Sequence, residues 1–126
     1  IQAGAFIEVY WKDTPEERGP VAIVCVGTRE ILKFDCYGPP SGHIHVHNRY
    51  PQNSLYGRLF MAEANVTEQI DRSVFELTTN IHIYMQGNNR QSVRHTILQP
   101  EALARAAEQM RIRMLEIEHT VFADRN

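Results

Sequence analysis

The run His43-Ile44-His45-Val46-His47 places an imidazole at every second position of the chain. Imidazole nitrogens are common protein ligands for zinc, copper or nickel, and an imidazole oriented by a carboxylate can act as a base or a nucleophile. Alternating polar and apolar residues are typical of a half-buried strand, whose successive side chains point to opposite faces of a sheet. We therefore expect the three histidines to share one face, and Ile44 and Val46 to share the other.

The segment Ile31 to Tyr37 is predicted to form the strand that pairs with the histidine run. A strong chain break, Gly38-Pro39-Pro40-Ser41-Gly42, separates the two. If this break joins antiparallel strands symmetrically, polar residues lie opposite the histidines: Tyr37 opposite His43, Asp35 opposite His45, and Lys33 opposite His47. A slip by one residue would mix apolar and polar side chains on both faces, so this register is the consistent one. We call the predicted polar surface of Lys33, Asp35, Tyr37, His43, His45 and His47 the histidine face.

Metal binding is the first chemistry that this face suggests. Neighbouring positions on one face of a strand are about 6.6 Å apart, so two imidazoles can lean onto one ion, whereas the outer pair is about 13 Å apart and cannot easily join them. A site for a divalent metal such as zinc would therefore need a mixed donor set of His43, His45 and Asp35. Asp35 would act either as a ligand or as an acceptor that orients the His45 ring.

Catalysis by histidine is the second chemistry. A hydrogen bond between Asp35 and His45 would select one tautomer of the imidazole and raise its basicity, which makes these two residues the candidate catalytic pair. The remaining residues of the face would then bind the substrate: Lys33, Tyr37, His43 and His47. The run also resembles the His-φ-His-φ-His-φ-φ signature of the histidine-triad nucleotide hydrolases, which implies a phosphoester or nucleotide substrate. The alternative is that the three histidines are structural and make only ordinary hydrogen bonds, without a catalytic or metal-binding role.

The rest of the chain must position this face, and its patterns predict one α+β domain. We expect the sheet in residues 1–62 and two helices in residues 65–122. β-Branched and aromatic runs predict strands at 5–12, 20–26, 31–37 and 43–47, with a short fifth strand at 58–61 after a loop over 48–57. Turn signals between consecutive strands favour an antiparallel meander.

Two apolar stripes at helical spacing predict two long amphipathic helices after the sheet. The stripes consist of Val66, Ile70, Val74, Leu77, Ile81 and Tyr84, and of Leu103, Ala107, Met110, Met114, Ile117 and Val121. Asn65 and Glu68 form a capping-box-like start for the first helix, Gly87-Asn88-Asn89 ends it, and Pro100 opens the second. Such helices are about 30 Å long and the expected strands about 20 Å, so we expect part of the stripes, Leu77 and Met114 included, to form a homodimer interface.

Residues 31–84 combine five features in a fixed order: an aromatic–Asp element, a glycine turn, closely spaced histidines, a short aromatic strand and a capped helix. They correspond to Phe34-Asp35-Cys36-Tyr37-Gly38, Gly42-His43-Ile44-His45-Val46-His47 and Leu59-Phe60, followed by the first helix. In these features the chain resembles the TumE-like toxins of bacterial toxin–antitoxin systems. The resemblance implies a bacterial protein whose partner is a cognate antitoxin, with Asp35, His43, His45 and His47 as the matched polar positions.

Composition and charge narrow the function classes without selecting one. The 126 residues are 43% hydrophobic and carry a formal net charge of −2 with neutral histidines, so a strongly basic nucleic-acid binder is not expected. No apolar run reaches the length of about 18 residues that a membrane span needs, and Cys25 and Cys36 lack disulfide or zinc-ribbon spacing. We expect a cytoplasmic protein without membrane association. It is either a dimeric interaction module, related to toxin–antitoxin proteins as the resemblance implies, or a small histidine-based or metal-dependent hydrolase.

Overall fold

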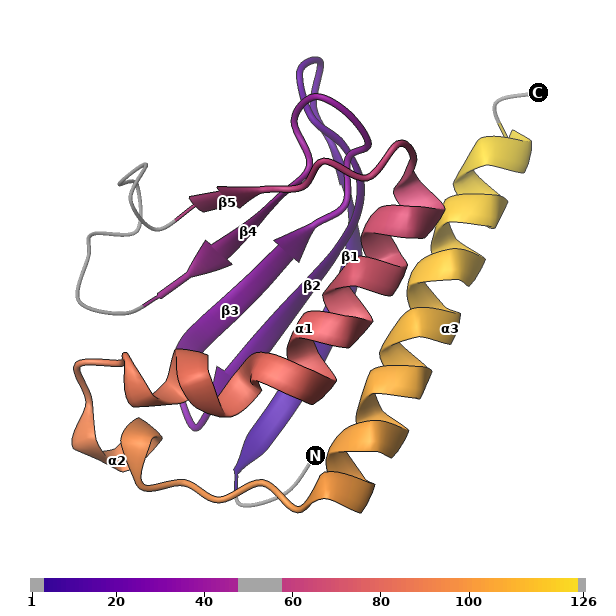
Figure 1. Ribbon diagram of the computed structural model, residues 1–126. Helices are drawn as coiled ribbons and strands as arrows, with labels where there is room; N and C mark the ends of the chain where they lie inside the picture. The colour runs from indigo at the N-terminus through magenta and orange to yellow at the C-terminus, as the bar shows by residue number, and fades with distance from the viewer. Residues whose placement is uncertain (1–3, 48–57, 125–126) are drawn as a thin grey trace.

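A computed structural model describes residues 4–47 and 58–124, and the predicted loop at 48–57 lies outside the described residues. Five strands form one antiparallel sheet in the order β1-β2-β3-β4-β5, and three helices follow (Figure 1). The strands are β1 (Ala5–Asp13), β2 (Arg18–Val26), β3 (Arg29–Asp35), β4 (His43–Val46) and β5 (Arg58–Phe60). The helices are α1 (Val66–Gln86), α2 (Gln91–Arg94) and α3 (Pro100–Asp124). The expected α+β class and the antiparallel meander are confirmed.

The two long helices lie side by side on one face of the sheet (Figure 1). Helix α3 contacts β1 and β2, and α1 contacts β3. The core between these layers contains side chains that alternate along the strands and recur along the helices, among them Val24, Leu32, Phe34, Ile44, Ile70, Leu77, Ile81 and Met114. Within the described part of the chain, no helix covers the opposite face of the sheet. That face carries Asp35, His43 and His45, together with the apolar residues Val21 and Ile23 of β2.

Helix α1 begins and ends where the local sequence predicts. The side chain of Asn65 accepts a hydrogen bond from the Glu68 amide at 2.8 Å, as an N-cap residue does. The carboxylate of Glu68 accepts from the Ala64 amide at 3.1 Å, one residue before the cap. At the other end, Gly87 donates its amide to the carbonyl of Ile83. Both ends depend on residues within one turn, which explains why the sequence is sufficient to predict them.

The predicted pairing between β3 and β4 is wrong by two residues. Asp35 lies opposite His43 and Lys33 opposite His45, where Tyr37 and Asp35 were expected. The connection is longer than a symmetric turn because β3 ends at Asp35 and residues 36–42 leave the ladder. The amide of Gly38, at a φ of 78°, donates instead to the α1 side chain Gln69. An even shift returns every side chain to its predicted face, so the histidine face survives the correction.

The predicted dimer residues lie inside the chain. Leu77 and Met114 are both 0% exposed, because α1 and α3 pack these side chains against the sheet and against each other. Strands β1 and β2 have nine residues each, longer than expected, and so cover more of the helical stripes. The exposed apolar side chains of the helices are others, Phe75, Ile83 and Ile112. Any association through the helices would use these outer residues.

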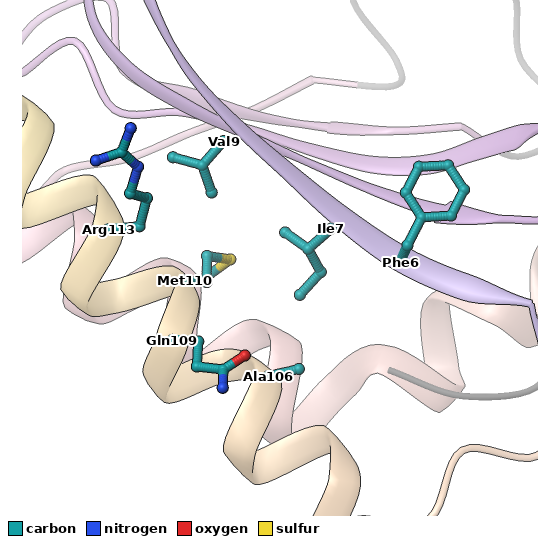
Figure 2. Close-up of a pocket in the computed structure, with 7 residues that line it drawn as sticks. All are labelled: Phe6, Ile7, Val9, Ala106, Gln109, Met110 and Arg113. Atoms are coloured by element: carbon teal, nitrogen blue, oxygen red, sulfur yellow. The ribbon is translucent and has the colours of Figure 1, made fainter.

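Helix α3 leaves a groove of about 400 Å³ at the β1 edge of the sheet (Figure 2). Ile7 and Val9 of β1 and Met110 of α3 line it, and Gln109 and Arg113 reach it from α3. Strand β1 is at one edge of the sheet and β5 is at the other. The groove is therefore separate from the histidine face on β3 and β4.

None of the helices in residues 4–47 and 58–124 has the length and apolarity that a membrane crossing requires.

Candidate metal centre

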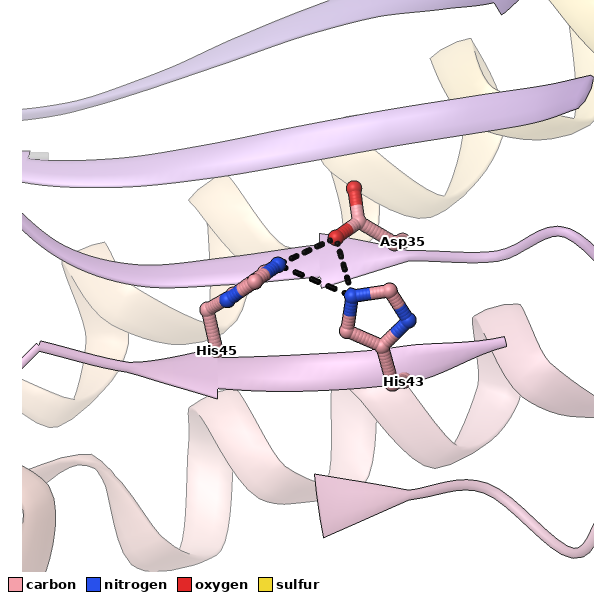
Figure 3. Close-up of side chains that lie close together, drawn as sticks. All are labelled: Asp35, His43 and His45. Carbon is pink, nitrogen blue, oxygen red and sulfur yellow. Dashed lines mark hydrogen bonds and ion pairs between the residues drawn. The ribbon is translucent and has the colours of Figure 1, made fainter. Parts of the chain in front are cut away.

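Three polar side chains of the histidine face meet at a single point. Asp35 ends β3, and His43 and His45 belong to the neighbouring strand β4, on the side of the sheet away from the helices (Figure 3). The distance from Asp35 Oδ2 is 3.0 Å to His43 Nε2 and 3.0 Å to His45 Nε2, and the two Nε2 atoms are 2.8 Å apart. Asp35 is 1% and His43 3% exposed. These three residues, the triad, form the one group of possible metal ligands found among the described residues.

The backbone selects the tautomer of His43. Its Nδ1 lies 2.7 Å from the carbonyl oxygen of Ser41. A carbonyl oxygen only accepts, so Nδ1 carries the proton in this contact. The neutral form of His43 then presents a lone pair at Nε2, directed at Asp35 and His45. A metal-binding histidine commonly has this arrangement, in which the second ring nitrogen donates to a backbone carbonyl.

Protons cannot make all three contacts of the triad favourable. An ionised carboxylate only accepts, and each Nε2 atom supplies at most one proton. If both imidazoles are protonated at Nε2, the contact between His43 and His45 brings two N–H donors together. If only one is protonated, the other faces the Asp35 oxygen with an acceptor against an acceptor. A cation at the centre removes this conflict because all three atoms then donate lone pairs to it.

The spacing of the three atoms matches metal coordination. Ligands at bonds of about 2.0–2.1 Å lie about 2.9 Å apart when they subtend 90°, and about 3.3 Å apart in a tetrahedron. The observed separations of 2.8 and 3.0 Å correspond to three neighbouring positions of an octahedron. Three protein ligands in this arrangement would leave the other coordination positions of an octahedral ion open.

Tyr37 and Lys33 hold the other oxygen of Asp35. The Tyr37 hydroxyl donates to Oδ1 at 3.0 Å, and the Lys33 ammonium lies 3.8 Å from the same atom. The carboxylate is therefore turned so that Oδ2 alone faces the two imidazoles. Outer partners of this kind orient a ligand and tune its basicity. Both residues were predicted to bind a substrate, whereas the geometry gives them a direct role in positioning Asp35.

The local charges favour ionised Asp35. Burial alone would raise the pKa of this carboxyl, but hydrogen bonds from His43 and His45 and the nearby Lys33 ammonium outweigh burial and hold the pKa well below its usual range. Burial alone would lower the pKa of His43, but its contacts with Asp35 and the Ser41 carbonyl raise it. Burial, followed by the negative charge of Asp35, raises the pKa of Tyr37 and keeps it a hydrogen-bond donor. These contacts favour the anionic form of Asp35 at neutral pH.

His47 does not join the triad. Its ring stacks on that of His45 with centroids 5.9 Å apart, and its Nε2 lies 2.6 Å from Glu30 Oε2, off the line of a well-aligned hydrogen bond. Burial lowers the pKa of His47. From strand geometry we expected that His43 and His47, at the two ends of the run, are too far apart to bind one ion together. The position of His47 outside the triad agrees with that expectation.

Sequence reasoning missed two residues of β5 that border the triad. Arg58 lies directly opposite His45, and Phe60 lies opposite His43 with ring centroids 5.6 Å apart. The fifth strand was expected, but nothing in the sequence gives its register across residues 48–57. The only available signal was the short aromatic strand itself.

Comparisons with known proteins give this chain no relative. No family model matches it, and no curated protein or solved structure matches it at a significant level. Its function is therefore inferred from the geometry of the site.

Proposed function

We propose that this protein is a small metal-dependent hydrolase that acts on a phosphoester through Asp35, His43 and His45. The observation that carries the proposal is the convergence of Asp35 Oδ2 and the two Nε2 atoms at separations of 2.8 to 3.0 Å, which no assignment of protons to the imidazoles makes favourable while Asp35 is ionised. A divalent ion held by these atoms supplies a Lewis acid for a phosphoryl oxygen and lowers the pKa of a water molecule.

The same geometry disfavours a metal-free mechanism. In an in-line displacement at phosphorus, the attacking and leaving oxygens lie on opposite sides, so a general base and a general acid must be well separated. The Nε2 atoms of His43 and His45 are only 2.8 Å apart. They also contact the same carboxylate oxygen, so they cannot serve as base and acid on opposite sides of a phosphorus atom. The same short distances suit three ligands of one metal ion.

Tyr37 and Lys33 support the proposed chemistry without contacting the ion. The Tyr37 hydroxyl holds Asp35 Oδ1, and the Lys33 ammonium is near enough to attract an anionic substrate. The Phe60 ring lies against the His43 ring, with centroids 5.6 Å apart. These residues keep the donor atoms in place before a substrate arrives, which is the general requirement for a preorganised site.

The test uses protein purified without a histidine tag. Zn²⁺, Mn²⁺ and Fe²⁺ are titrated by calorimetry, the last without oxygen, and phosphomonoesters and phosphodiesters are screened with each metal. We expect one equivalent of metal, and a loss of affinity of at least about 100-fold in His45→Ala, because even outer-shell changes cost 10–100-fold. His47→Ala is the matched control, a histidine on the same face outside the triad, and should retain affinity. No stoichiometric metal, or iron-dependent oxygen consumption without hydrolysis, would contradict the proposal.

A second candidate function is an interaction module, and one observation favours it. Phe75 and Ile83 of α1 and Ile112 of α3 are 53%, 69% and 46% exposed on the outer surface of the helices. Exposed apolar side chains that form a contiguous patch are common features of protein interfaces. The surface suits a second copy of the chain, and the resemblance to TumE-like toxins suggests an antitoxin as another occupant. Sedimentation of wild-type protein and of Phe75→Glu tests self-association, because a dimer through this surface would dissociate in the variant.

A further inference from the structure

Arg58 lies beside the triad in the sheet, and no acidic side chain of the described residues pairs with it. It lies directly opposite His45 on β5, as Lys33 does on β3, so His45 is flanked by a cation on each side. Residues directly opposite in an antiparallel pair have Cβ atoms about 4.5–5.5 Å apart and point to the same face. Arg58 therefore stands beside the triad on the helix-free face of the sheet.

The guanidinium of Arg58 is incompletely satisfied. Its Nε is shielded from solvent and has no hydrogen-bond partner, and no carboxylate of the described residues pairs with Arg58. Other arginines of the fold do have acids, for example Arg72 with Glu63 and Glu76. A shielded donor without an acceptor is unfavourable, so an incoming acceptor that reaches the Arg58 guanidinium would stabilise it.

The positive charge near the triad also favours binding of an anion. Asp35 supplies a single negative charge, and Lys33 already lies 3.8 Å from it. A bound divalent metal would add further positive charge to the same place. An anionic ligand that contacts both the metal and Arg58 would relieve this repulsion.

We propose that Arg58 binds the phosphoryl group of the substrate, with its guanidinium on two phosphoryl oxygens while a third faces the triad. The planar fork of arginine matches two oxygens of a tetrahedral phosphate, a geometry that lysine does not provide. This inference rests on the proposed function, because it assigns the substrate class of the same site. Arg58 would act as a binding and positioning residue, and His43 and His45 keep their role as metal ligands.

The test measures metal and phosphate binding separately. Zn²⁺ and then inorganic phosphate are titrated by calorimetry into wild-type protein, Arg58→Gln and Arg58→Lys. We expect unchanged zinc affinity in both variants and at least about tenfold weaker phosphate binding in Arg58→Gln, since charge-assisted hydrogen bonds are lost. Arg58→Lys should be intermediate, and it remains informative if the glutamine variant fails to fold. Arg113→Gln, an exposed arginine at the β1 groove, is the matched control.

The outcomes separate this inference from the proposed function. Equal phosphate affinity in wild type and Arg58→Gln, or no phosphate binding by wild type at millimolar concentration, overturns the role of Arg58 even when zinc binds. If zinc does not bind, the proposed function fails, and the phosphate titration of the metal-free protein then decides the role of Arg58 independently. Loss of phosphate binding in Arg58→Gln and its retention in Arg113→Gln support the role in either case.

Discussion

Asp35 and His43 lie directly opposite each other on β3 and β4, and the 3.0 Å contact between Asp35 Oδ2 and His43 Nε2 is matched by an equal contact with His45. One oxygen thus contacts two imidazole nitrogens that also contact each other. The relationship depends on the pairing of two strands, since Asp35 and His43 are separated by a seven-residue connection that leaves the ladder. It makes Asp35 the residue whose replacement is most informative.

Asp35→Asn should abolish tight metal binding while the chain remains folded. The amide keeps the shape of the side chain and the contact with Tyr37, but a neutral oxygen is a much poorer ligand for a divalent ion than a carboxylate. We expect an affinity loss of at least about 100-fold by calorimetry, larger than the loss from any outer partner. Circular dichroism checks the fold. Unchanged zinc affinity in a folded variant would remove Asp35 from the ligand set.

Tyr37→Phe should weaken metal binding about tenfold without changing its stoichiometry, because the hydroxyl orients the ligating carboxylate from behind. Tyr84→Phe is a matched control. The Tyr84 hydroxyl also donates to a carboxylate, that of Glu76 at 2.6 Å, but on helix α1. The control should lose stability and keep its metal affinity. Equal affinities in the two variants would show that Tyr37 has no role in positioning Asp35.

The stability of the fold should depend on pH through Glu76. Burial alone would raise the pKa of this carboxyl, but hydrogen bonds from Tyr84, Asn80 and Arg72 outweigh burial and lower it. A depressed pKa stabilises the folded state above the ordinary value of 4.5, and this stabilisation is lost as the pH falls through the folded-state pKa. Urea unfolding should therefore show that Glu76→Gln is less stable by roughly 1–3 kcal/mol at pH 7.

That stability difference should shrink as the pH is lowered below about 4.5, because the wild-type carboxyl then also becomes neutral. Comparison with Glu76→Gln at each pH cancels the titration of all other groups, including the histidine face. Glu108→Gln, on the exposed surface of α3, should differ little from wild type at any pH because solvent screens its contact with Arg111. A difference for Glu76→Gln that stays constant down to pH 3 would contradict the assignment.

Substitutions at core positions of the helices should lower the free energy of unfolding much more than substitutions at surface positions. Leu77→Ala should destabilise the chain by about 2–5 kcal/mol, because it leaves a cavity where the side chain is 0% exposed. Phe75→Ala, two residues away and 53% exposed, should cost no more than about 0.5 kcal/mol. Chemical denaturation at low protein concentration measures both. A large loss for Phe75→Ala that grows with protein concentration would indicate that self-association stabilises the fold.

The fold class follows from short-range patterns in the sequence. Alternation with period two requires His43 and His45 to share a face, and a register error of two residues leaves that face intact. Asn65 and Gly87 bound helix α1 through contacts within one turn. Sequence reasoning therefore grouped Asp35, His43 and His45, the three residues that meet in the structure. The shared face of the two histidines and the ends of helix α1 depend only on local backbone geometry, whereas the position of Asp35 beside them also depends on strand pairing.

The tertiary structure alone decided which atoms meet. The length of the connection from β3 to β4 depends on contacts such as that between Gly38 and Gln69, which are far apart in the sequence, and it brings Asp35 opposite His43. The position of Arg58 opposite His45 depends on a strand pairing that no local pattern encodes. The apolar stripe of a helix is equally compatible with burial by the sheet and with burial by a second copy of the chain. In the structure Leu77 is buried within the chain. The sequence by itself determines which side chains share a face of a strand or helix. Several strand registers are compatible with that periodicity, and only non-local packing selects the one that brings the site residues together.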